Sequence, residues 1–167
     1  MRKELQSRGR ERGVMLIEAL IAILIFSIGI LAVVGMQGMA IKNVTESKYR
    51  SEAGFLANEL LAQMWTDAGN INLYAYPGSG SIPAKLGTIT PPTGWIGRVS
   101  QLPGATVTLP RVTVVPPPPM VVIPPAVAPP APIGGTVTIE LFWQLPEEAS
   151  AGLPPRKHMV IASVFTS

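Results

Sequence analysis

Residues 13–37 read GVMLIEALIAILIFSIGILAVVGMQ, an apolar run that contains a single charged side chain, Glu18. From Ala19 to Ile41 the chain has neither a charged residue nor a proline. A helix over those residues is roughly 35 Å long at about 1.5 Å per residue, which is enough for the roughly 30 Å hydrocarbon core of a bilayer. The stretch therefore predicts one membrane-spanning helix over residues 14–41.

Residues 1–13, MRKELQSRGRERG, form a leader with five basic and two acidic side chains. A positively charged flank stays on the cytoplasmic side of a membrane, so we expect the N-terminus inside and the rest of the chain across the membrane. The competing interpretation is a secretory signal peptide, which has a shorter apolar core and a small-x-small cleavage site. That interpretation does not account for Glu18.

A carboxylate near the centre of a bilayer costs on the order of 2.5–3.5 kcal/mol, so such a residue usually has a partner. On position alone, Glu18 is also compatible with the membrane edge, because residues 19–41 can span without it. The pattern of Gly13, four apolar residues and Glu18, placed between a basic leader and a spanning helix, resembles the class III signal of type IV prepilins and pseudopilins. The resemblance implies cleavage after Gly13 by a membrane prepilin peptidase, N-methylation of Val14, and docking of Glu18 on a neighbouring subunit's amine.

The rest of the chain is similar, less specifically, to PilV-type minor pilins in the segments Leu60–Trp65, Trp95, Leu102–Gly104 and Val137–Trp143. This resemblance implies a non-catalytic minor pilin that primes or modifies type IV pilus assembly near the tip and affects adhesion. Its implied partners are the prepilin peptidase and methylase, other minor and major pilins, and the inner-membrane assembly platform. It would reside in the bacterial inner membrane with a periplasmic head, and then in the pilus at the cell surface. The alternative is a minor pseudopilin of a type II secretion system.

Charge and composition argue against other classes of function. The chain has 13 basic and 10 acidic residues, and without residues 1–13 eight of each remain, so the basic pI gives no reason to expect nucleic-acid binding. There is no cysteine and one histidine, so we expect no metal and no cofactor. His158 follows two basic residues, a pattern typical of a solvated turn, and Asp67, Glu147 and Glu148 lack partners at a recognisable catalytic spacing. We therefore expect no enzymatic activity.

Helical spacing continues beyond the membrane segment. A stripe of apolar residues favours an amphipathic helix over residues 42–68 with Leu61 and Trp65 beside the stripe, and the charged side chains mostly take the other faces. Gly69-Asn70 is a typical end for that helix. The stripe consists of Val44, Ala53, Leu56, Leu60 and Met64.

Residues 69–167 predict a loop-rich β head, which makes the expected fold class α+β: a long helix packed against a small antiparallel sheet. Residues 70–104 are rich in turn signals, and Trp95-Ile96 is expected to anchor this loop on the helix. Strands are expected at Ala105–Leu109, Arg111–Val115, Thr136–Leu145 and Met159–Phe165, the last of them more buried because it hardly alternates.

Residues 116–132, PPPPMVVIPPAVAPPAP, hold nine prolines in seventeen positions and cannot lie in a central strand. We interpret the segment as a stiff insertion between two strands. The functional alternative is a polyproline II arm that presents a ligand for a proline-recognising groove, or that contacts a neighbouring subunit through its apolar residues.

Overall fold

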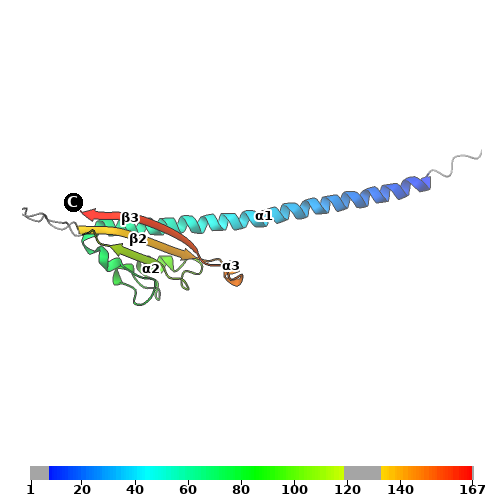
Figure 1. The fold of residues 1–167 in the computed structure, drawn as a ribbon. Helices are drawn as coiled ribbons and strands as arrows, with labels where there is room; N and C mark the ends of the chain where they lie inside the picture. Colours follow the sequence, from blue (N-terminus) through cyan, green and yellow to red (C-terminus); the bar gives the residue numbers. More distant parts are fainter. Residues whose placement is uncertain (1–7, 119–132, 167) are drawn as a thin grey trace, which may run out of the picture. The chain divides into compact units, whose positions relative to one another are not determined.

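The computed structural model describes residues 8–118 and 133–166; the proline-rich segment 116–132 therefore lies almost wholly outside the described residues. The chain divides into two compact units, Met1–Glu46 and Ser47–Ser167. The first unit consists of helix α1, and the second holds the end of α1, two 3-10 helices, two short α-helices and three strands (Figure 1). The layout is α+β, as predicted: one long apolar N-terminal helix and a small antiparallel sheet.

Helix α1 runs from Arg8 to Thr66, 59 residues without a proline. Every described side chain from residue 13 to residue 44 is exposed, including its large aliphatic and aromatic residues. A helix that is apolar on all sides belongs in a membrane or in the core of an assembly. By length and composition, the segment is able to cross a membrane.

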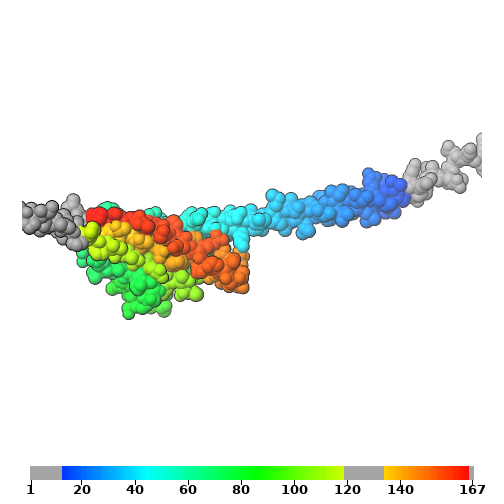
Figure 2. Space-filling model, in the orientation of Figure 1, coloured from blue at the N-terminus to red at the C-terminus, as the bar shows by residue number. Residues whose placement is uncertain are grey.

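The head, residues 47–167, is built on a three-stranded antiparallel sheet of order β1-β2-β3. Strand β1 spans Arg111–Val115, β2 spans Ile133–Trp143 and β3 spans Arg156–Thr166, and in register Val112 lies opposite Ile139, which lies opposite Val160. Figure 2 shows β3, in red and orange, as a long surface-lying strand of the head. Short elements complete this unit: η1 (Ala68–Tyr74), η2 (Ala84–Leu86), α2 (Gly94–Val99) and α3 (Pro146–Ser150).

One face of the sheet and one face of α1 form the core of the head. The predicted alternation of β2 is confirmed: Val137, Ile139, Leu141 and Trp143 are at most 3% exposed, and the residues between them are half-buried. The predicted helix stripe is confirmed from Ala53 to Met64, whereas Val44 is 69% exposed and lies in the first unit. The core residues shared by these two elements are Ala53, Leu56, Ala57, Leu60, Met64, Val137, Ile139, Leu141 and Trp143.

Three local predictions are wrong. Residues 105–109 form turns and no strand, because Gly104, at φ +73°, starts a chain reversal in which the amides of Val107 and Thr108 donate to its carbonyl. Helix α1 ends at Thr66, and Gly69-Asn70 lie inside η1. The third concerns β3, which was expected to be the more buried strand.

Strand β3 alternates in exposure although its sequence does not. Like the central strand β2, it packs on the core with one face only, and on that face only Val164 is fully buried. On the other face Met159, Ile161 and Phe165 are exposed. A run of apolar residues predicts a strand, but it does not show whether one face or both faces of that strand are covered.

Candidate functional site

The three residues predicted to direct processing and docking lie in one continuous helical stretch near the start of α1. Gly13 and Val14 flank the proposed cleavage position, and Glu18 follows one helical turn after Val14. Val14 is 64% exposed and a Cβ at Gly13 would meet no atom within 4 Å, so the site is sterically open in this chain. Glu18 makes no hydrogen bond or ion pair with residues 13–118 or 133–166.

The other polar side chains at this end of the helix differ from Glu18. Ser27 donates its hydroxyl to the carbonyl of Ile23 at 2.7 Å, and Thr45 donates to the carbonyl of Ile41 at 2.9 Å. A hydroxyl that bonds the preceding turn of its own helix is satisfied without a partner. Glu18 is therefore the charged group of the apolar segment that has no polar partner within residues 13–118 and 133–166.

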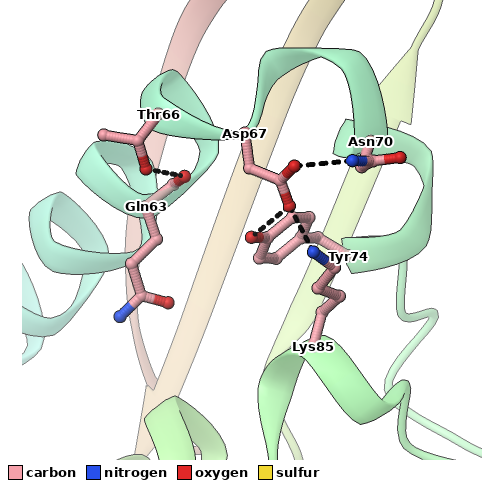
Figure 3. Close-up of polar contacts among 6 residues, drawn as sticks. All are labelled: Gln63, Thr66, Asp67, Asn70, Tyr74 and Lys85. Carbon is pink, nitrogen blue, oxygen red and sulfur yellow. Dashed lines mark hydrogen bonds and ion pairs between the residues drawn. The ribbon is translucent and has the colours of Figure 1, made fainter.

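At the other end of α1, a polar cluster fixes the exit of the chain (Figure 3). The carboxylate of Asp67 accepts hydrogen bonds from Asn70 Nδ2 at 2.7 Å and from the Tyr74 hydroxyl at 3.0 Å, and it forms an ion pair with Lys85. Thr66 donates to the carbonyl of Gln63 at 2.8 Å. The cluster joins η1 and η2 directly after the end of α1 at Thr66.

These contacts shift the protonation of the cluster in a consistent direction. The hydrogen bond from Lys85, followed by that from Asn70, lowers the pKa of Asp67 to about 2. The same bond to Asp67 raises the pKa of Lys85, while burial and then the bond to Asp67 raise the pKa of Tyr74. The cluster gives Asp67 three polar partners, two from η1 and one from η2.

Two side chains of α2 hold the turn-rich segment on α1. Trp95 is 1% exposed, and its indole Nε1 donates to the backbone carbonyl of Leu56 at 2.7 Å. Arg98 forms an ion pair with Glu59, which also accepts from Gln63. The predicted anchoring by Trp95-Ile96 is therefore confirmed, although the helix that carries these residues was not predicted.

Two other titratable residues, Glu148 and His158, lie in the C-terminal part of the head. Glu148 is 4% exposed; it accepts from the backbone amide of Leu145 at 3.2 Å and pairs with Arg156 Nη2 at 2.7 Å, which ties α3 to β3. His158 lies within β3 and outside any turn, with its ring close enough to Gly54 that a Cβ there would be 3.6 Å from Nε2. The position of His158 within β3 corrects its expected place in a solvated turn.

No group of three His, Asp or Glu side chains within residues 8–118 and 133–166 is arranged to hold a metal ion. Comparisons of the chain with protein-family models, curated proteins and solved structures find no match.

Proposed function

We propose that this protein is the precursor of a minor pilin, a structural subunit that primes or modifies a type IV pilus. The observation that carries the proposal is Glu18: the one charge between Val14 and Ile41, on an exposed apolar helix, four residues after the Gly13–Val14 bond. The basic leader favours a cytoplasmic N-terminus and a periplasmic head.

Helix electrostatics give a physical reason for Glu18 of one subunit to bind the cleaved N-terminus of another. Cleavage after Gly13 would leave an ammonium group at the N-terminus of a long helix, next to backbone amides without intrahelical acceptors. The helix dipole disfavours a positive charge there and favours a carboxylate. A carboxylate from a neighbouring helix would satisfy that terminus, and in a low-dielectric bundle the pairing also fixes the axial register of two subunits.

The position of Glu18 near one end of the apolar segment explains why an unassembled anchor helix tolerates the carboxylate. In the membrane, Glu18 lies one turn from the end of the apolar segment, where it can reach the interface. In a bundle of such helices it gains a cationic partner. The residue would therefore cost little before assembly and contribute most after it, as expected of a docking group.

Two substitutions in a strain that lacks the native gene test the proposal. Gly13→Leu should leave the full-length precursor in the membrane with residues 1–13 attached, because a bulky side chain replaces the open glycine. Glu18→Ala should give a processed, membrane-inserted chain that enters filaments at least about tenfold less, as for the loss of about 1.4 kcal/mol. Ser27→Ala is the matched control, because Ser27 is satisfied within its own helix.

Normal maturation of the Gly13→Leu variant would contradict the cleavage site. Native incorporation of the Glu18→Ala variant would remove the docking role. A processed chain that stays with the membrane and never enters filaments would favour the minor pseudopilin of a type II secretion system.

A further inference from the structure

The peptide bond assigned to processing lies inside a helix. Helix α1 begins at Arg8, so the Gly13–Val14 bond has helical residues on both sides. In an α-helix each carbonyl accepts a hydrogen bond from the amide four residues later, which here joins the Gly13 carbonyl to the Ile17 amide and the Arg10 carbonyl to the Val14 amide. The carbonyl and the amide of the bond to be cut are therefore both engaged within the helix.

Hydrolysis needs these two groups free. Water adds its hydroxyl group to the carbonyl carbon of Gly13 and its remaining proton to the nitrogen of Val14. The acid proton then moves to the amine, which leaves a carboxylate at Gly13 and an ammonium group at Val14. A carbonyl held in the hydrogen bonds of a helix is not free to be attacked, so a peptidase acts on the locally opened form of the chain.

The fold itself does not require glycine at position 13. The φ angle of Gly13 is not positive, and an added Cβ there would meet no atom within 4 Å. What remains is the effect of glycine on the helix, which it stabilises less than alanine because it loses more conformational freedom on folding. Gly9, four residues earlier on α1, acts in the same direction.

The surroundings of the bond determine which side of it opens. Fewer than two helical turns separate Arg8 from Gly13, and the sequence there is that of a polar leader, so backbone groups released on this side bind water. From Val14 onward the exposed side chains are apolar apart from Glu18, and backbone groups released in hydrocarbon find no partner. Opening is therefore cheaper toward the leader.

We propose that Gly13 is a positioning residue for its own cleavage: it weakens the leader side of α1, so that the Gly13–Val14 bond opens for the peptidase while the helix from Val14 onward stays intact. This inference rests on the proposed function, which supplies the peptidase. A helix opens and closes within about a microsecond, whereas enzymes typically turn over about 1–1,000 times per second. The rate of cleavage therefore follows the population of the open form.

Paired substitutions in the full-length precursor, expressed in the native host, separate helix stability from the size of residue 13. Gly13→Ala should slow the removal of residues 1–13 about fivefold in a pulse-chase measurement, the equivalent of about 1 kcal/mol of helix propensity. Adding Glu11→Gly should restore the rate, whereas adding Glu11→Ala, which removes the same charge, should not. Gly29→Ala, where an added Cβ also meets no atom within 4 Å, is the control and should leave the rate unchanged.

Hydrogen exchange of the Ile17 amide in the detergent-solubilised precursor gives a readout that does not involve the peptidase. Exchange should be about fivefold slower in Gly13→Ala and should recover when Glu11→Gly is added. If Gly13→Ala slows cleavage but leaves this exchange unchanged, or if Glu11→Gly fails to restore the rate, the peptidase reads the size of residue 13 and the proposal is overturned.

The two proposals can fail separately. A chain cut at Gly13–Val14 whose Gly13→Ala variant matures at the unsubstituted rate would refute the role of helix opening and leave the minor pilin proposal intact. An unsubstituted chain that is never cut, or that is cut at another bond, would refute the processing site and this inference with it.

Discussion

The three tryptophans of the head occupy three different environments, so replacement by phenylalanine should be costly at one of them and nearly neutral at the other two. Trp95 is buried and its Nε1 donates to the carbonyl of Leu56. Trp143 is also buried, but its Nε1 has no hydrogen-bond partner within residues 8–118 and 133–166. Trp65 is half-exposed on α1. Replacement by phenylalanine removes the indole N–H and part of the ring at each site.

The expected costs follow from these environments. At Trp95, the lost hydrogen bond costs about 1 kcal/mol and the reduced packing about 1–2 kcal/mol, which together lower the free energy of unfolding by about 2–3 kcal/mol. At Trp143, a similar packing loss is offset by removal of an unpaired buried donor, worth about 1–3 kcal/mol, so the net change is close to zero. At Trp65 the change stays within about 0.5 kcal/mol.

Near-UV circular dichroism of the detergent-solubilised full-length chain reports unfolding of the head separately from the anchor helix. For a unit of this size, about 2–3 kcal/mol lowers the Tm by roughly 10 °C, so Trp95→Phe should be clearly separated from the other two variants. Equal destabilisation by Trp95→Phe and Trp143→Phe would refute the reasoning, because it would mean that the two indole N–H groups have equivalent partners.

Three further predictions concern polar and packing contacts of the head. The pKa of Asp67 is lowered from 3.8 to about 2, so the contribution of its carboxylate to stability is complete above pH 3.8 and is lost as the pH falls toward 2. In urea titrations, the difference in the free energy of unfolding between the unsubstituted protein and Asp67→Asn should therefore shrink over that range. A constant difference would contradict the role of the cluster. Glu148→Ala removes the buried carboxylate that pairs with Arg156 and should lower the free energy of unfolding of the head by about 3–5 kcal/mol. Thermal unfolding measures the loss, and Glu147→Ala, on the same short helix, is the control. Gly54→Leu places a large side chain where even an added Cβ would lie 3.6 Å from the His158 ring. Its Tm should therefore be lower than that of Gly69→Leu, where an added Cβ meets no atom within 4 Å. Equal Tm values would show that β3 is free to move.

Much of the fold was predictable because its signals are local. The apolar run in α1, the stripe from Ala53 to Met64 and the alternation in β2 each follow from the repeat of a single element. Gly13, Val14 and Glu18 were also recognised from adjacent residues, since the motif lies within a few helical turns. The likeness to a prepilin signal rests on that motif and stays a prediction.

The remaining features depend on contacts between residues distant in sequence. Helix α1 ends at Thr66, and the next residue, Asp67, is bound by Lys85, eighteen residues later, in a contact that no local pattern encodes. The alternating exposure of β3 follows from the packing of one face of the sheet on α1, which is a contact between residues distant in sequence.

Intact-mass and N-terminal analysis of this protein in sheared surface filaments from its native host tests the central proposal most directly. The account predicts a chain that begins at N-methylated Val14 and lacks residues 1–13. A chain that retains the leader, that is cut elsewhere, or that is absent from the filaments while processed in the membrane would contradict it.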